Sequence, residues 1–86
     1  MADLLRVRVM VQDVWDEVRF EVPASTPIAT LKARALASTG VTKPADVFEA
    51  KFRGALLSDE DRSIGDVGMV TNSTVILVPR RRRPVL

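Results

Sequence analysis

The stretch Asn72-Ser73-Thr74-Val75-Ile76-Leu77-Val78-Pro79 decides the fold of this 86-residue chain. Its first three residues are typical of a turn. The next four are β-branched or apolar, the pattern of a strand buried on at least one face. Alternation places Val75 and Leu77 inward and Ile76 and Val78 outward. Pro79 has no N–H to donate to a neighbouring strand, so we expect sheet pairing to stop there.

Two more strands are predicted near the start of the chain. Apolar residues occupy every second position of Leu4 to Val11 and again of Val18 to Val22, the period of a strand with one face against a core. The connecting segment lacks an Asn-Gly turn, so a β-hairpin with a longer loop is expected. Trp15, the single tryptophan, falls in this loop. It either contacts a partner or folds back onto the hairpin to cover its ring.

A helix is predicted to follow Pro23. Thr26 has an N-cap side chain, Pro27 suits the first helical position, and Gly40 can adopt a left-handed C-terminal cap. Lys32 and Arg34 are expected to point away from the apolar side of the helix. That side is one stripe at helical spacing, formed by Ile28, Leu31, Ala35 and Leu36. About three turns are too few for a stable isolated helix, so it must pack on the sheet.

The second half of the chain completes the sheet. Alternation from Phe48 to Arg53 predicts a third strand, Gly54 a turn, and Leu56-Leu57 a short edge piece. A last strand beside the first must run parallel to it and be central. The predicted class is therefore α+β, a mixed four- to five-stranded sheet with one helix packed across it. Loop residues are expected to fill the rest of the core, namely Ile64, Val67 and Met69.

This order of elements resembles ubiquitin and the β-grasp fold from about Leu5 to Arg81. The resemblance implies a ubiquitin-like domain over residues 1–79 and a basic tail over residues 80–86. It also implies a protein-binding role. The residues that carry it are Val22-Pro23-Ala24-Ser25-Thr26-Pro27-Ile28 with Leu31-Lys32, then Phe52-Arg53-Gly54-Ala55-Leu56-Leu57, Ile64-Gly65-Asp66-Val67-Gly68-Met69, and the closing strand Asn72 to Val78.

Two departures from the family bear on function. Conjugated ubiquitin-like proteins and sulfur carriers act through a C-terminal Gly-Gly, whereas about Arg83-Pro84 stands at that place here and no glycine follows Gly68. Because arginine is bulky and proline rigid, the tail is not expected to fit an activating enzyme. A non-conjugated module is therefore expected, with a modifier or sulfur carrier of atypical tail as the alternative. Lys51 replaces the central isoleucine of the family's reader-binding patch, which disfavours ubiquitin's own readers.

Composition argues against enzymatic chemistry and cofactors. The chain has no His, Cys or Tyr, which removes the commonest general base, the thiol nucleophile and most transition-metal ligands. Asp59-Glu60-Asp61 can in principle hold calcium through oxygen, but a solvated loop is the simpler interpretation. No signal peptide is evident and no apolar run reaches the ~18 residues that span a bilayer. These absences favour the cytoplasm.

The positive charge is concentrated at the end of the chain. Without Arg80–Arg83 the net charge of +2 becomes −2. A nucleic-acid-binding domain usually spreads its basic residues over a face, and no aromatic residue is interleaved here to stack on bases. The sequence therefore argues against nucleic acid as the main partner. A weak nucleic-acid or anionic-surface binder that acts through these arginines remains an alternative.

The outward face of the sheet is the predicted binding surface. Met10, Ile76 and Val78 are expected to form an apolar strip surrounded by cations, a mixture that suits protein interfaces. An ordinary exposed sheet face is the competing interpretation. The expected partner is a protein with an acidic or mixed apolar and acidic surface. The residues predicted to contact it are Arg6, Arg8, Met10, Trp15, Lys51, Arg53, Ile76, Val78, Arg80, Arg81, Arg82 and Arg83.

Overall fold

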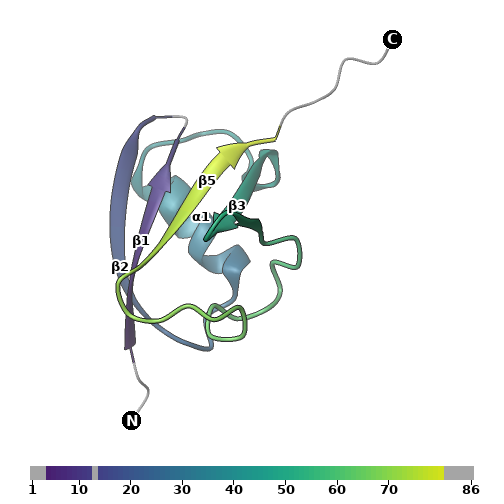
Figure 1. Ribbon diagram of the computed structural model, residues 1–86. Helices are drawn as coiled ribbons and strands as arrows, with labels where there is room; N and C mark the ends of the chain where they lie inside the picture. Colours follow the sequence, from purple (N-terminus) through teal and green to yellow (C-terminus); the bar gives the residue numbers. More distant parts are fainter. Residues whose placement is uncertain (1–3, 13, 81–86) are drawn as a thin grey trace.

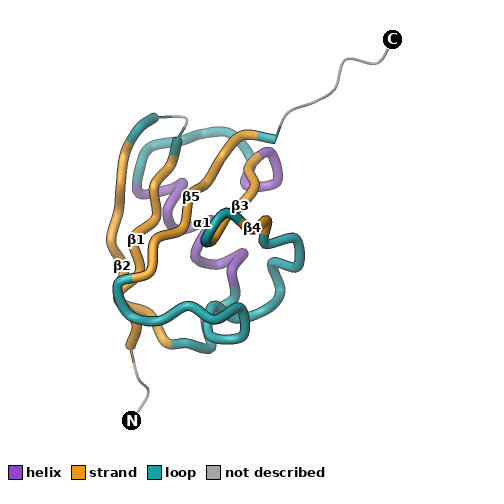
Figure 2. The backbone as a smooth tube through the Cα atoms, in the orientation of Figure 1, coloured by secondary structure: helices purple, strands orange, loops and turns teal. Residues whose placement is uncertain are grey.

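The computed structural model describes residues 4–12 and 14–80. Within them, five strands form one sheet in the order β2-β1-β5-β3-β4, and α1 crosses one face of that sheet (Figures 1 and 2). This is the predicted α+β architecture. The elements are β1 (Leu4–Val11), β2 (Asp16–Pro23), α1 (Ile28–Ser38), the short 3₁₀ turn η1 (Ala45–Val47), β3 (Phe48–Phe52), β4 (Ala55–Leu56) and β5 (Ser73–Pro79).

The parallel pairing of β1 with β5 forms the centre of the sheet. Val9 lies opposite Val75 and Val11 opposite Leu77, and all four side chains are buried. β2 pairs antiparallel with β1, and β3 pairs antiparallel with β5. The prediction that the last strand is central and parallel to the first is therefore confirmed.

Pairing along β5 ends where the sequence predicts. Pro79 lies opposite Phe48 in the ladder with β3. One residue later, the Arg80 backbone N–H donates to the Val47 carbonyl at 2.7 Å. Pro79 is tolerated because it occupies the last position of the strand. The prediction that pairing stops at Pro79 is therefore confirmed, because the Phe48–Pro79 pair is the last of the ladder and the Arg80 hydrogen bond closes it.

The start of α1 is capped by another part of the chain. The N-cap residue is Pro27 and not Thr26, and no side chain caps the helix. Instead, the Ile28 N–H donates to the Arg62 carbonyl at 3.0 Å and the Ala29 N–H donates to the Glu60 carbonyl at 2.9 Å. Two of the free donors of the first turn are thus satisfied by tertiary contacts. The predicted N-cap is wrong by one residue.

The apolar side of α1 and its end follow the prediction. The four residues of the predicted stripe are buried against the sheet, namely Ile28, Leu31, Ala35 and Leu36. Gly40 follows the helix with φ of 73°, the left-handed conformation expected of a C-terminal cap.

Residues 60–65 form a strap across the start of α1. In addition to the two carbonyls that cap the helix, the Ile64 N–H donates to Thr26 and the Gly65 N–H donates to Ala24, each at 2.9 Å. A Cβ atom on Gly65 would lie 3.0 Å from both the Cβ and the carbonyl oxygen of Ala24. Glycine therefore permits this close approach. Ile64 is fully buried beneath the strap, so the strap also completes the core, as predicted for Ile64.

A two-residue turn joins β3 to β4. Phe52 pairs with Ala55, and the residues between them, Arg53 and Gly54, have φ of 54° and 78°. Positive φ at both positions is what a type I′ hairpin turn requires. Gly54 is a turn residue as predicted. Arg53 was expected to extend the third strand, which is wrong: it lies in the turn, with its guanidinium 5.2 Å from the centroid of the Phe52 ring.

Candidate functional site

The candidate site lies on the outer face of the sheet, which faces away from α1. Strand register aligns five side chains in one row across all five strands of the described sheet, and we call this the central row. Ile76 of β5 is in its middle, 39% exposed, and Leu56 of β4 is at one end, 51% exposed. The row consists of Glu17, Met10, Ile76, Lys51 and Leu56.

The central row brings together several residues that the sequence predicts to contact a partner. Met10 lies opposite Ile76, and Ile76 lies opposite Lys51. Val78 follows Ile76 by two residues on the same face of β5. It is half-buried and lies opposite Glu49. The sequence pattern missed Leu56 at the edge because β4 is only two residues long, too short to show alternation.

Beside the central row, three arginines surround a hollow of about 350 Å³. Arg8 of β1 lies directly opposite Arg19 of β2, and Arg6 lies opposite Glu21. We call this feature the arginine hollow. It is lined by Arg6, Val7, Arg8, Arg19, Phe20, Glu21 and Asn72. Of these, only Arg6 and Arg8 were predicted to contact a partner. Arg19 was missed because two arginines become neighbours only through hairpin register.

The charges around the arginine hollow are unevenly compensated. The Arg6 Nε atom lies 3.2 Å from Glu21 Oε1, and the Arg19 Nε atom lies 3.6 Å from Glu17 Oε1. Arg8 forms no ion pair or side-chain hydrogen bond with residues 4–12 and 14–80. Like charges directly opposite each other in a sheet are unfavourable. Arg8 and Arg19 therefore repel each other, and an exposed ion pair to Arg19 offsets little of that repulsion.

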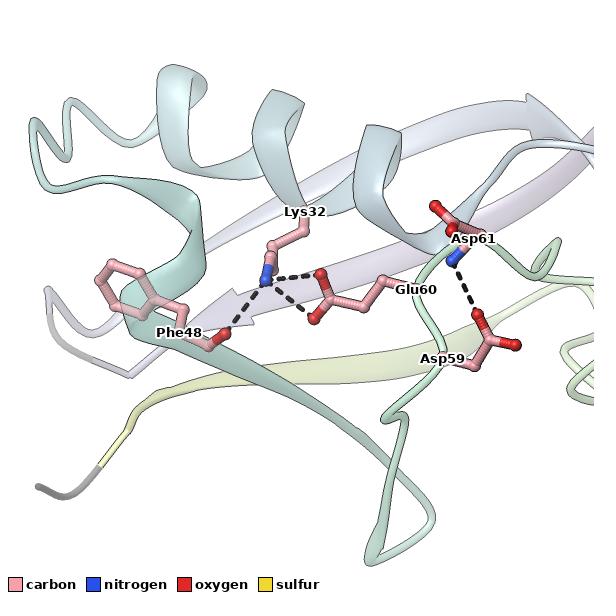
Figure 3. Close-up of polar contacts among 5 residues, drawn as sticks. All are labelled: Lys32, Phe48, Asp59, Glu60 and Asp61. Atoms are coloured by element: carbon pink, nitrogen blue, oxygen red, sulfur yellow. Dashed lines mark hydrogen bonds and ion pairs between the residues drawn. The ribbon is translucent and has the colours of Figure 1, made fainter.

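Unlike the exposed Arg8, Lys32 is a buried cation, and its side chain lies between α1 and the strap (Figure 3). The prediction that it points away from the apolar stripe is wrong, because its side chain is only 3% exposed. Its Nζ atom lies 2.7 Å from Glu60 Oε1 and donates to the Phe48 carbonyl at 3.0 Å. Spacing contained the missing signal, since Ile28, Lys32 and Leu36 recur every four residues and so share one side of the helix.

The acidic segment Asp59–Asp61 has a structural contact that its sequence does not suggest. Glu60 turns inward to Lys32 and is only 20% exposed, so the solvated-loop interpretation is wrong for this residue. Asp59 remains exposed and accepts a hydrogen bond from the Asp61 backbone N–H at 3.2 Å (Figure 3). Within the part of the chain that the structure describes, no group of three acidic side chains is arranged to hold a metal ion.

Trp15 is at the tip of the β1–β2 hairpin and is 76% exposed. The interpretation in which its ring folds back onto the hairpin is therefore wrong. Its backbone has φ of 52°, and its N–H donates to the Gln12 carbonyl at 3.3 Å. Val14 beside it is 44% exposed. The hairpin tip thus presents the large apolar side chains of Val14 and Trp15 to solvent.

The predicted tail contacts are only partly described. Arg80 is exposed, and its backbone N–H is bonded to the Val47 carbonyl. Arg81, Arg82 and Arg83 lie outside the described residues. Over residues 4–12 and 14–80, no helix has the length and apolar character needed to cross a membrane.

Solved structures of ubiquitin-like domains share this architecture. A ubiquitin-like domain of an Arabidopsis thaliana protein matches with a TM-score of 0.73 and 16% identity, over 96% of this chain and 84% of that one. This chain has the ubiquitin-like fold. The N-terminal ubiquitin-like domain in the 4931431F19Rik protein matches with a TM-score of 0.70 and 23% identity, over 100% of this chain and 84% of that one. Neither a protein-family model nor a curated protein sequence matches this ubiquitin-like chain.

Proposed function

We propose that this chain is a ubiquitin-like protein-binding module that docks through the outer face of its sheet. The observation that carries the proposal is the central row, which holds three apolar side chains from three strands, the half-buried Met10 and the exposed Ile76 and Leu56, together with the charged Glu17 and Lys51. Ile76 at its centre is 39% exposed although it belongs to the middle strand of the sheet. Large apolar side chains ringed by polar ones are the usual anatomy of a protein interface.

The rigidity of this surface supports the same role. Met10, Ile76 and Lys51 are on three neighbouring strands whose opposite faces are buried in the core. Their backbone positions are therefore fixed before a partner arrives, which reduces the entropy lost on binding. A preorganised sheet face of this kind can bind a protein without any catalytic group.

The chemistry of the face defines the partner. Lys51 and Arg8 have no acidic partner among the described residues, so a partner that supplies carboxylates next to apolar groups fits best. Trp15 and Arg80 are proposed as secondary contacts at the end of the sheet where β5 finishes. Tryptophan and arginine are both enriched among the residues that dominate binding energy.

A comparison of immobilised variants tests the proposal. The chain would be used to capture proteins from its source organism as the wild type, as the double variant Ile76→Asp with Lys51→Glu, and as the control Val70→Asp. Val70 is 56% exposed and lies outside the strands, so the control places a carboxylate on an exposed apolar site away from the central row, as Ile76→Asp does within it.

We expect at least one protein to be retained by the wild type and the control and to bind the double variant at least ~10-fold more weakly, as for loss of a hot spot. Circular dichroism would verify that every variant is folded. If the double variant kept every partner of the wild type at the same affinity, the outer face would not be the binding surface.

A further inference from the structure

The arginine hollow contains a positive charge that the surrounding residues do not balance. Arg6 is paired with Glu21 and Arg19 with Glu17, which leaves Arg8 as the third guanidinium. Thr74 of β5 lies opposite Arg8 on one side and Arg19 of β2 lies opposite it on the other. The neighbours of Arg8 on the same face of β1 are Arg6 and Met10. No strand that flanks Arg8 therefore places a carboxylate opposite it.

This arrangement is unfavourable unless an anion occupies the hollow. Arg8 and Arg19 face each other directly across the hairpin, and both are exposed at the rim of a hollow of about 350 Å³. A guanidinium offers a planar fork of N–H donors that fits a carboxylate through two parallel hydrogen bonds. An anion between the two arginines would replace their repulsion with two attractive contacts.

We propose that the arginine hollow binds one aspartate or glutamate side chain of the protein partner. This inference rests on the proposed function, because it assigns the chemistry of one subsite on the same face. One uncompensated guanidinium matches one singly charged carboxylate. Glu21 lines the hollow and disfavours a phosphate group, which carries about −1.5 to −2 charges at neutral pH.

The position of the hollow sets the spacing of the partner's groups. Arg8 and Met10 are two residues apart on one face of β1, which separates them by about 7 Å along the strand. A partner that places an apolar side chain on the central row therefore presents its carboxylate about 7 Å away. An extended segment with the pattern apolar–any–acidic meets this requirement, as does a helix with the two groups at i and i+4.

A titration with short peptides tests the subsite without a known partner. The probe is the capped peptide Leu-Ser-Glu, the isosteric control is Leu-Ser-Gln, and inorganic phosphate is the competing anion. The readout is the Nε–Hε resonance of each arginine in two-dimensional NMR. We expect the Glu peptide to shift Arg8 and Arg19 selectively and to bind about fivefold more tightly than the Gln peptide, the scale of an exposed charged contact.

Three outcomes of the titration would overturn the proposal. Equal shifts with the Glu and Gln peptides would mean that the hollow does not recognise a carboxylate. Phosphate that binds more tightly than the Glu peptide would reassign the hollow to phosphate groups. A general charge effect would shift all exposed arginines alike, Arg62 included, and would also contradict a defined subsite.

Variants separate failure of this inference from failure of the proposed function. With a captured partner, Arg8→Gln is expected to weaken binding about fivefold, and Arg8→Lys to recover only part of it because the fork is lost. The control Arg62→Gln removes the same charge from the strap, where Arg62 donates to the Asp66 carbonyl at 3.2 Å. It should leave binding unchanged.

If Ile76→Asp abolishes binding while Arg8→Gln and Arg62→Gln both leave it intact, the subsite is wrong and the docking face stands. If none of the three changes the affinity, the proposed function itself fails.

Discussion

The two faces of the sheet are built from the same strands, but their side chains differ in exposure and in charge compensation. β5 places Val75 and Leu77 on the inner face, where they are 2% and 1% exposed, and Ile76 on the outer face, where it is 39% exposed. On the inner side a charge is kept only with full compensation, as Lys32 is by Glu60 and the Phe48 carbonyl. On the outer face Arg8 stands opposite Arg19 without compensation. Stability thus depends on the inner side, and the outer face can hold groups that serve the proposed binding and contribute little to stability.

The largest effect is expected at neighbouring residues of β5. Leu77→Ala should lower the free energy of unfolding by about 3 kcal/mol, because it removes a buried side chain and leaves a cavity. Ile76→Ala, on the other face of the same strand, should cost less than about 1 kcal/mol. Chemical denaturation monitored by circular dichroism would measure both. Equal losses would mean that the outer face is as important to stability as the core.

The next effect concerns two lysines that differ only in location. Lys32→Ala should destabilise the fold by about 3 kcal/mol, because it leaves the partly buried Glu60 carboxylate without a counter-charge and the Phe48 carbonyl without a donor. Lys51→Ala should change stability by less than about 0.5 kcal/mol. Denaturation curves of the two variants are the measurement.

The matched double variant sharpens this comparison. Lys32→Met together with Glu60→Gln removes both charges, so it should recover part of the loss caused by Lys32→Ala. A double variant less stable than Lys32→Ala would show that the charges themselves, and not their pairing, hold the strap in place.

The smallest effect has the opposite sign. Arg8→Thr should raise the free energy of unfolding by about 0.5 kcal/mol, because it removes the repulsion with Arg19 across the hairpin. The gain should shrink as salt is added, since exposed charges are screened. Thermal unfolding at low and high ionic strength measures it. Arg6→Thr is the control, and because it breaks the pair with Glu21 it should give no gain. A loss of stability for Arg8→Thr would contradict the assigned repulsion.

Short-range patterns predicted most of the fold. The strand alternation, the apolar stripe of α1 and the central parallel strand were all correct, because each follows from residues close together in the chain or from one topological rule. Two of the errors share one cause. Thr26 is not the cap and Lys32 is not exposed because the strap, about thirty residues later, supplies the carbonyls and the carboxylate. Local spacing indicates the side of the helix on which Lys32 lies, but it does not reveal partners at that separation in the chain.

The candidate site was predictable to a similar extent. Met10, Ile76 and Lys51 could be placed on one face because strand alternation fixes the face of each residue. The pairing of Arg8 with Arg19 and the place of Leu56 depend on register, which the sequence did not specify. Arg53 was misplaced because a positive φ at a non-glycine residue is decided by the turn type and not by the preceding strand.

The pairing of β1 with β5 has a consequence for how the chain folds during synthesis. β1 cannot complete its pairing until β5 has been synthesised, because Val7 pairs with Ser73 and Val11 with Leu77. Until β5 has left the ribosome, the β1–β2 hairpin carries an open inner edge, and the apolar side of α1 has only part of its sheet. Contacts between such distant residues slow folding and leave strand edges exposed to aggregation. We therefore expect this small domain to fold late, in one step, after its last strand has emerged.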